Sequence, residues 1–308
     1  MRFSVYQESQ IGGRKMNQDR MGYSFTRDAL LLLLADGMGG HLHGEVAAAI
    51  AMQTVGALFQ QQATPYIKKP ERFLEDSFFA AHREIHRHRA VQNLPETPRT
   101  TIVACLIQHN TAFWAHCGDS RLYWMRNGQI LSRTRDHSRI ETLIAQGRAA
   151  PSERATHPDR NKLFNCLGAP NMPIVEISRR ASLQAGDVML LCSDGLWGAL
   201  PDHLLAQRLQ TNTIVRAVPE LISTALGISG KNSDNVTALA MMWESSSNVT
   251  DMNTITTNIL PVGAMTTTIQ SPQAAESDAA SFDESEIEKA IEEIRGAIEK
   301  SSRLTSRN

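Results

Sequence analysis

Four aspartates stand next to short apolar segments along the chain, each at the point where such a segment ends or begins. They are Asp36 after ALLLLLA, Asp119 after AFWAHC and a glycine, Asp194 after VMLLC and a serine, and Asp234 shortly before VTALAMM. Short apolar runs bounded by turn residues predict buried strands. We therefore expect all four carboxylates at the rims of packed sheets, where functional sites are commonly built.

Carboxylates that converge in this way repel one another and need protons, basic partners or cations. Oxygen-only donors suit hard divalent ions such as Mg2+ or Mn2+. Glycine follows both Asp36 and Asp194, and a residue without Cβ lets its own carbonyl approach an ion closely. Asp-Gly after a strand is also a common turn signal. One such pair alone favours a turn, but four acids so placed favour a metal site.

Composition limits the classes of function. The 308 residues include 31 basic and 32 acidic side chains, a net charge of -1, so nothing draws the chain to nucleic acid or anionic membrane. The longest apolar run, at 29–35, is too short to cross a bilayer, and the N-terminus has no signal-peptide segment. We expect a cytoplasmic protein. Its four cysteines lack paired CxxC spacing, which predicts reduced, buried thiols and no zinc site.

Apolar periodicity indicates a mixture of helices and strands. The helices expected are 45–61, 71–92, 138–146, 201–209 and 215–226, and the strand segments 3–6, 29–35, 100–107, 111–119, 121–130, 188–192 and 236–242. Asn127-Gly128 predicts a tight hairpin. The basic segment His82–Arg89 could bind a metal or phosphate, but we expect a solvated helix face.

The sequence predicts three regions. Residues 1–243 form one catalytic domain, whose polar insert at about 147–173 has the length of a functional lid. Residues 244–280, rich in Ser, Thr, Asn, Ala and Gln, read as a flexible linker. In 281–308 a capping box precedes a stripe of Ile287, Ile291, Ile294 and Ile298 with acidic flanks, which predicts a helix. It either folds back on its own domain or docks a partner or a second copy.

Six motifs together resemble one family. They are Arg14-x-x-Asn17-Gln18-Asp19, Asp36-Gly-Met-Gly-Gly40, Cys117-Gly-Asp119-Ser-Arg121, Asp136-His137-Ser138, Ser193-Asp194-Gly195-Leu-Trp197 and Asp234-Asn235-Val-Thr237. Their order is that of the PPM, or PP2C-like, metal-dependent serine/threonine phosphatases. The likeness covers about residues 1–243, and His41-x-x-Gly44-Glu45 with His157-Pro158-x-Arg160-Asn161 resembles the bacterial branch. It implies an α+β fold, a β-sandwich of two antiparallel sheets flanked by helices (αββα), with 147–173 as a flap and a C-terminal extension.

The resemblance also implies a site. Asp36 would bridge two Mn2+ or Mg2+ ions, with the Gly37 carbonyl on one ion and Asp194 and Asp234 on the other. Asp119 would help to hold a third, weaker ion. A water molecule bridging two such cations would attack the phosphorus of phosphoserine or phosphothreonine directly, without a covalent enzyme intermediate.

Three further side chains receive roles from the resemblance. Arg14 would clamp the phosphoryl oxygens with its planar fork, Asp19 would orient the water, and Asn235 would support Asp234. The implied activity is that of a protein-serine/threonine phosphatase. Its substrates would be phosphorylated proteins, and it would counteract a Ser/Thr protein kinase.

Two departures from the family leave questions open. Met38 stands where some relatives have a histidine that is the candidate general acid, so a metal-bound water, His41 or His157 would protonate the leaving group. Gly198 stands where some relatives have an acid, which leaves the ligands of a third ion open.

The sequence lacks the motifs of two other classes of phosphate-handling enzyme. A cysteine-dependent phosphatase needs Cys-x5-Arg, but Tyr123 occupies that position after Cys117, and a P-loop is absent around Gly230. The remaining rival is a PPM-fold regulator that binds phosphorylated partners with little or no catalysis. Metal-dependent turnover separates this rival from an enzyme.

Overall fold

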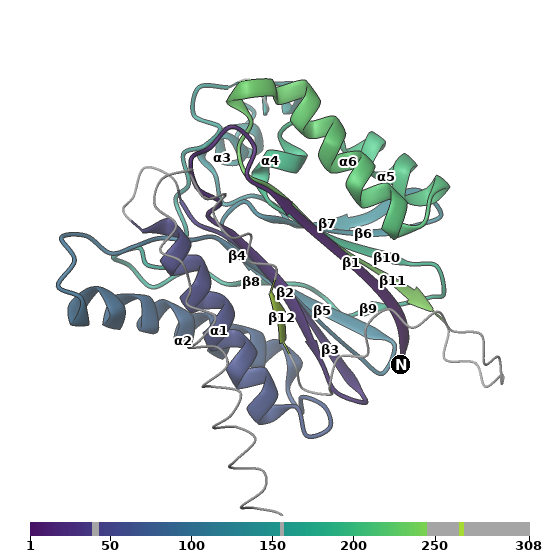
Figure 1. Ribbon diagram of the computed structural model, residues 1–308, viewed down its shortest axis with the longest axis horizontal. Helices are drawn as coiled ribbons and strands as arrows, with labels where there is room; N and C mark the ends of the chain where they lie inside the picture. Colours follow the sequence, from purple (N-terminus) through teal and green to yellow (C-terminus); the bar gives the residue numbers. More distant parts are fainter. Residues whose placement is uncertain (39–42, 155–156, 245–264, 268–308) are drawn as a thin grey trace, which may run out of the picture. The chain divides into compact units, whose positions relative to one another are not determined.

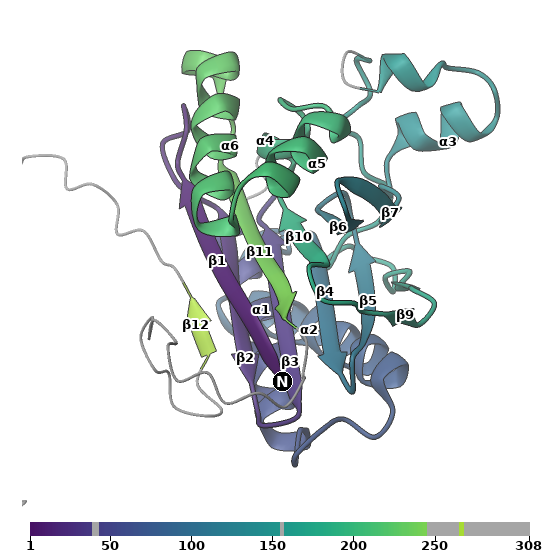
Figure 2. The ribbon, with the colours of Figure 1, turned by 90° about the vertical axis from the view of Figure 1, so that its right-hand side faces the viewer.

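Two antiparallel β-sheets lie face to face, and helices cover the outer face of each. The computed structural model describes residues 1–38, 43–154, 157–244 and 265–267. Helices α1 (Gly44–Gln62) and α2 (Pro70–Val91) lie on one side, and α5 (Asp202–Thr211) and α6 (Ile214–Ser229) on the other (Figure 1). In the view turned by 90°, α5 and α6 lie at the top, and α1 and α2 lie lower, behind the strands (Figure 2). The predicted αββα sandwich is confirmed.

The strand order brings segments from both ends of the chain together. One sheet has the order β1 (Arg2–Gln10), β11 (Val236–Glu244), β10 (Val188–Cys192), β6 (Arg121–Arg126) and β7 (Gln129–Arg133). The other has β12 (Met265–Thr267), β2 (Asp19–Phe25), β3 (Ala29–Asp36), β4 (Ile102–Gln108), β5 (Thr111–Cys117) and β8 (Glu176–Ile177), with β9 (Ala181–Ser182) also paired with β5.

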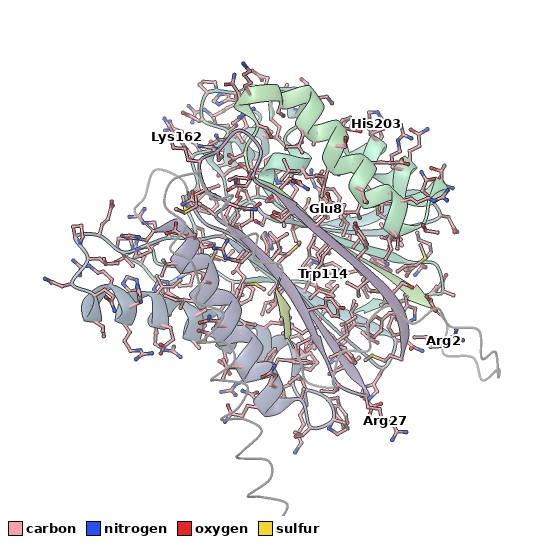
Figure 3. All side chains as sticks on the ribbon, viewed as in Figure 1. Arg2, Glu8, Arg27, Trp114, Lys162 and His203 are labelled. Carbon is pink, nitrogen blue, oxygen red and sulfur yellow. The ribbon has the colours of Figure 1, made fainter. Side chains whose placement is uncertain are left out.

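Strand β3 shows why the leucine run is continuous. Successive residues on a strand face opposite sides of the sheet. Leu31 and Leu33 pack in the cluster under α1 and α2, whereas Leu30, Leu32 and Leu34 pack in the cluster between the sheets. Trp114, labelled in Figure 3, belongs to the same inter-sheet cluster. Because both faces of the strand are covered, every position is apolar.

Local signals in the sequence correspond to observed turns and caps. Asn127 and Gly128 have φ values of 49° and 72° between β6 and β7, the hairpin that the Asn-Gly pair predicts. Helix α3 (Arg139–Ala145) begins after Ser138, whose side chain accepts a hydrogen bond from the Glu141 N–H. All four cysteines are buried and free, as predicted.

The prediction of a solvated helix face at His82–Arg89 is wrong for His82, and His86 is only half-exposed. His82 is buried, and its Nδ1 lies 3.2 Å from the backbone nitrogen of Gly168. His86 Nε2 lies 2.9 Å from the carbonyl oxygen of Ala169. These contacts join α2 to the segment that leads out of the predicted flap.

The C-terminal predictions fall mostly outside the described residues. Strand β12 pairs antiparallel with β2 and lies inside the range predicted as a linker. All described residues belong to one compact unit. The helix predicted at 281–308 lies outside the described part and stays a prediction. Among the helices that are described, none has the length and apolar character to cross a membrane.

A buried ion pair holds β6 against the segment that leads to α3. Arg121 Nε and Nη2 donate to the two carboxylate oxygens of Asp136 at 2.8 and 2.7 Å, and both side chains are only 2% exposed. The guanidinium also lies 3.6 Å from the centroid of the Trp197 ring. The pair raises the pKa of Arg121, although burial alone would lower it.

We expect Asp136→Asn to lower the free energy of unfolding by about 3–5 kcal/mol, because it leaves the Arg121 charge buried without its partner. Urea denaturation followed by circular dichroism measures the loss. The matched control is Asp76→Asn, which breaks the exposed Arg72–Asp76 pair (70% and 62% exposed) and should cost less than about 1 kcal/mol. Equal losses in the two variants would contradict this account.

Candidate metal centre

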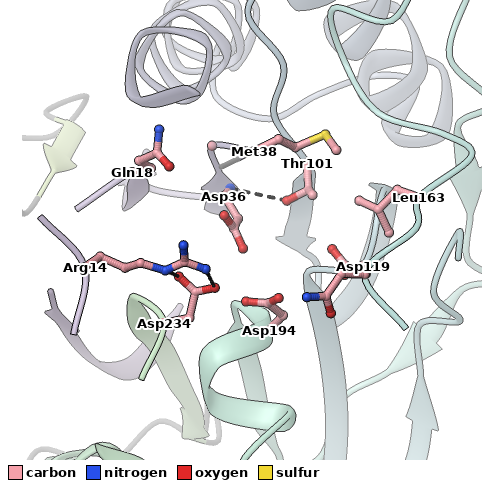
Figure 4. Close-up of a pocket in the computed structure, with 11 residues that line it drawn as sticks. Arg14, Gln18, Asp36, Met38, Thr101, Asp119, Leu163, Asp194 and Asp234 are labelled. Carbon is pink, nitrogen blue, oxygen red and sulfur yellow. Dashed lines mark hydrogen bonds and ion pairs between the residues drawn. The ribbon is translucent and has the colours of Figure 1, made fainter. Parts of the chain in front are cut away.

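A cavity of about 290 Å3 opens where the strands of both sheets end. Figure 4 shows the carboxyl groups of Asp36, Asp194 and Asp234 directed toward a common space, with Asp119 at its side. The cavity is lined by polar groups and a few apolar ones: Arg14, Gln18, Asp36, Gly37, Met38, Thr101, Asp119, Asn161, Leu163, Asp194 and Asp234. The structure thus brings together every predicted site residue except Asp19.

Each carboxylate is positioned by the end of a regular element. Asp36 is the last residue of β3, and Asp119 lies in the turn between β5 and β6. Asp194 begins the short helix α4 (Asp194–Trp197) directly after β10 and Ser193, and one residue separates Asp234 from the start of β11. These are the rim positions predicted from the apolar runs.

Two glycines allow the segments that carry the acids to approach closely. A Cβ on Gly195 would overlap the backbone carbonyl of Asn235, so only glycine lets the start of α4 approach the Asp234 turn. A Cβ on Gly37 would likewise overlap the backbone of Gly44 at the start of α1. The glycine after Asp36 therefore allows close packing against α1, and it also lines the cavity.

The carboxylates raise one another's pKa. Burial raises the pKa of Asp36 and of Asp194 well above the ordinary value, and neighbouring carboxylates raise both further. Burial, followed by the charge of Asp136, raises the pKa of Asp119 to about 7. Of the described lining residues only Arg14 carries a positive charge, so the acids are under-compensated.

That one cation is already engaged. Arg14 Nε and Nη2 donate to the two oxygens of Asp234 at 2.8 and 2.6 Å, a bidentate pair that raises the pKa of Arg14 (Figure 4). Because the rest of the cluster is an oxygen-only donor set with raised pKa values, the residues present fit divalent cations such as Mn2+ or Mg2+.

Asp19 lies behind the cavity and not in its lining. It pairs with Asp36 across β2 and β3, is 2% exposed, and its Oδ2 accepts a 2.7 Å hydrogen bond from Ser193 Oγ. Its Oδ1 is buried with no hydrogen-bond partner within the described part of the chain. Burial raises the pKa of Asp19. An unpartnered carboxylate oxygen next to Asp36 is a further sign that a cation or its water completes the site.

Asn235 fastens the Arg14 loop to the Asp234 turn. Its Oδ1 accepts from the Gln18 N–H at 2.8 Å, and its Nδ2 donates to the carbonyls of Ile11 and Met16 at 2.8 and 3.1 Å. Only its backbone N–H reaches Asp234, at 2.8 Å from Oδ1. The side chain predicted to support Asp234 thus mainly positions the loop that carries Arg14.

Sequence reasoning missed several supports. Thr100 Oγ1 donates to the carbonyl of Asp36 at 2.8 Å, and Thr101 Oγ1 lies 3.3 Å from the Asp36 nitrogen. Trp197 Nε1 donates to the carbonyl of Asp119 at 2.9 Å. The threonines and the tryptophan were visible beside or within the motifs, but nothing local indicates contacts across 64 to 78 residues.

The structure bears on which group could protonate the leaving group, for which His41 and His157 were two of the candidates. Met38 lines the cavity, and none of the described lining residues is a histidine. His157 lies outside that lining, and its Nδ1 accepts from the Asp159 N–H at 3.0 Å. His41 lies outside the described residues. From the flap range the cavity receives Asn161 and Leu163 instead.

A second cluster, His116, His137 and Glu176, places one potential ligand atom from each residue within 4.8 Å of the others. The two imidazole rings are stacked, with centroids 4.5 Å apart and planes at 25°. An ion bound by imidazole nitrogen lies near the ring plane, and two stacked rings cannot direct their lone pairs at one ion. We therefore assign this cluster no metal.

The sequence of this chain is similar to those of known phosphatases. Residues 7–227 match the family model described as protein phosphatase 2C. The chain is 32% identical over 226 residues to the serine/threonine protein phosphatase PstP of Mycobacterium tuberculosis, across 73% of this chain and 42% of PstP. It is 28% identical over 229 residues to the serine/threonine phosphatase stp of Listeria innocua, across 73% of this chain and 90% of that protein.

A solved structure has the same fold. The catalytic domain of PstP in complex with two manganese ions superposes with a TM-score of 0.66 at 29% identity, covering 79% of this chain and 99% of that domain. This chain therefore corresponds to nearly all of that catalytic domain, although it spans less than half of full-length PstP.

The crowded acids predict how the metal-free protein responds to pH. Burial raises the pKa of Asp119 in the folded state to about 7, from an ordinary value of 3.8, so the folded state binds more protons between these values. The contribution of Asp119 to stability is therefore complete at and below about pH 3.8, and it is lost as the pH rises through about 7. We expect the melting temperature in EDTA to fall over this range, less so in Asp119→Asn, and Mn2+ to restore it. An Asp119→Asn profile parallel to that of wild type would contradict the assignment.

Proposed function

The chain belongs to the protein phosphatase 2C family, and we propose that it hydrolyses phosphoserine and phosphothreonine in proteins with Mn2+ or Mg2+ as cofactor. The observation that carries this proposal is the convergence of Asp36, Asp119, Asp194 and Asp234 on one cavity beside Arg14. We take residues 1–243 as the catalytic domain and 147–173 as its flap.

The chain's own residues supply the metal ligands. The carboxylates of Asp36, Asp194 and Asp234 and the carbonyl of Gly37 would hold two core ions, and Asp119 would help to hold a third. When bound, such ions neutralise phosphoryl charge and lower the pKa of a water molecule. Asp19, paired with Asp36 on the neighbouring strand, would accept a hydrogen bond from that water and so orient it.

Arg14 would bind the phosphoryl group. Its guanidinium presents two parallel N–H donors, the geometry in which it already holds Asp234. When Asp234 is neutralised by a cation instead, these donors become available to phosphoryl oxygens. The side-chain and backbone contacts of Asn235 keep the Arg14 loop close to the cavity.

The substrates would be phosphorylated proteins, and the enzyme would reverse the action of a Ser/Thr protein kinase. The polar lining of the cavity, which includes Gln18 and Asn161 besides the acids, suits a phosphorylated side chain of a protein. The names of the relatives, PstP and stp, support this substrate class.

A phosphoprotein-binding regulator with the same fold is the alternative. Four crowded acids would not help such a regulator to bind a phosphorylated partner, and their mutual repulsion lowers the stability of the metal-free protein. The retained ligand set therefore favours the enzyme, and turnover distinguishes the two functions.

We expect a phosphothreonine peptide to be hydrolysed in Mn2+ and not in EDTA. Asp194→Asn should lower kcat/KM at least about a hundredfold. Even substitution of a residue that only supports a metal ligand commonly lowers metal affinity or activity about tenfold or more. Asp76→Asn, the same change on the exposed face of α2, should leave the rate unchanged. A wild-type protein that binds Mn2+ but turns over none of several phosphopeptides would favour the binding regulator.

Arg14→Lys tests the phosphoryl clamp separately from the metal ligands. A lysine keeps the charge but cannot make the bidentate contact, so kcat/KM should fall roughly tenfold to a hundredfold. Calorimetric Mn2+ binding should not weaken, because the guanidinium competes with cations for Asp234. Weaker Mn2+ binding with an unchanged rate would show that Arg14 serves the metal site and not the substrate.

A further inference from the structure

Residues 163–167, in the second half of the flap range, run between the supports of two predicted metal ligands. Phe164 N donates to the carbonyl of His137 at 3.0 Å, and Leu167 exchanges backbone hydrogen bonds with Thr100 at 2.9 and 3.2 Å. Thr100 in turn holds the carbonyl of Asp36. This stretch, which we call the flap arm, therefore belongs to the frame of the site.

His137 connects the flap arm to the turn that carries Asp119. Its backbone N–H donates to the carbonyl of Gly118 at 2.9 Å, and its ring Nδ1 lies 3.2 Å from the Gly118 nitrogen. The same Nδ1 lies 2.6 Å from Nδ2 of Asn165 in the flap arm. Asn165 is itself fixed by hydrogen bonds to both backbone groups of Ile174.

These partners determine where the His137 proton lies. Both groups that face Nδ1 are N–H donors, so Nδ1 must be an unprotonated acceptor. A neutral ring then carries its proton on Nε2, which lies 3.4 Å from Glu176 Oε2. Burial, and next the neighbouring His116, lower the pKa of His137 to about 4, so the ring is neutral near pH 7.

The Gly118 turn is closely packed, and His137 supplies its hydrogen-bond partners. Gly118 has φ of +114°, and a Cβ there would lie 2.6 Å from the Cβ of Thr101. Asp119 follows directly, and its carbonyl is held by Trp197. The direction of the Asp119 carboxylate therefore depends on a turn that His137 holds at both the N–H and the carbonyl of Gly118.

We propose that His137 is a positioning residue which, through its Nδ1 acceptor, holds the Gly118–Asp119 turn in the geometry that a cation needs and ties it to Asn165 of the flap arm. The inference rests on the proposed function, because it concerns the Asp119 ligand of that site. It concerns the acceptor atom and not the charge of the ring.

Two variants separate the acceptor from the bulk of the side chain. In His137→Asn the amide oxygen can take the place of Nδ1 as acceptor, whereas His137→Leu fills similar space and accepts nothing. Mn2+ binding, without substrate, is measured by calorimetry and by the relaxation of water protons. We expect the weakest Mn2+ site to weaken roughly tenfold in His137→Leu and to stay within about threefold of wild type in His137→Asn.

A double mutant tests whether His137 acts through Asp119. If it does, His137→Leu should add no further loss of Mn2+ affinity to Asp119→Asn. Independent losses that add would overturn the proposal. So would Asn and Leu variants that behave alike, whether both match wild type or both lose affinity equally while remaining folded by circular dichroism.

Histidine 15N spectra supply a readout that needs no metal. The His137 signals are assigned by their absence from the spectrum of His137→Leu, and they should show the proton on Nε2. In Asn165→Asp the new side chain cannot donate to Nδ1, so a proton should move to Nδ1. A wild-type ring protonated at Nδ1 would overturn the inference. A wild-type protein without turnover would refute the proposed function, while the tautomer and the Mn2+ isotherms would still decide the role of His137.

Discussion

The mutual repulsion of buried carboxylates is the constraint on which the site depends. Burial and then the charges of neighbouring acids raise the pKa values of Asp36, Asp119 and Asp194, while Arg14, the one cation in the described lining of the cavity, is hydrogen-bonded to Asp234. A fold that relaxed freely would separate them. The sandwich prevents this, because each acid stands at the end of an element packed into the core. Divalent cations are the natural counter-charge for such an arrangement.

The scaffold resists that repulsion with polar contacts that are themselves buried. The Arg121–Asp136 pair lies below the Asp119 turn and stacks on Trp197, which also holds the Asp119 carbonyl. On the other side of the cavity, Asn235 makes three contacts to the Arg14 loop. Regular elements thus place the ligands, and side-chain hydrogen bonds hold the irregular loops between them.

Much of this organisation could be predicted from the sequence because it is encoded locally. Apolar runs marked β3, β10 and β11, helical spacing marked α1 and α2, and the motifs marked the acids. What the sequence could not show were contacts between distant segments. These include Asp19 beside Asp36, Arg14 paired with Asp234, and His82 buried against Gly168. Each depends on how separate elements pack or pair, for which residue type and spacing carry no signal.

Anomalous diffraction from crystals grown with Mn2+, recorded at the manganese absorption edge, tests the central claim most directly. The account predicts two strong peaks in the cavity about 3.5–4 Å apart, with Asp36 between them and Asp194 and Asp234 on one. Arg14 should then be released from Asp234. Two results would contradict the account. One is anomalous density at the His116–His137 pair and none in the acidic cavity. The other is an Arg14–Asp234 pair that stays intact with no ion bound next to it.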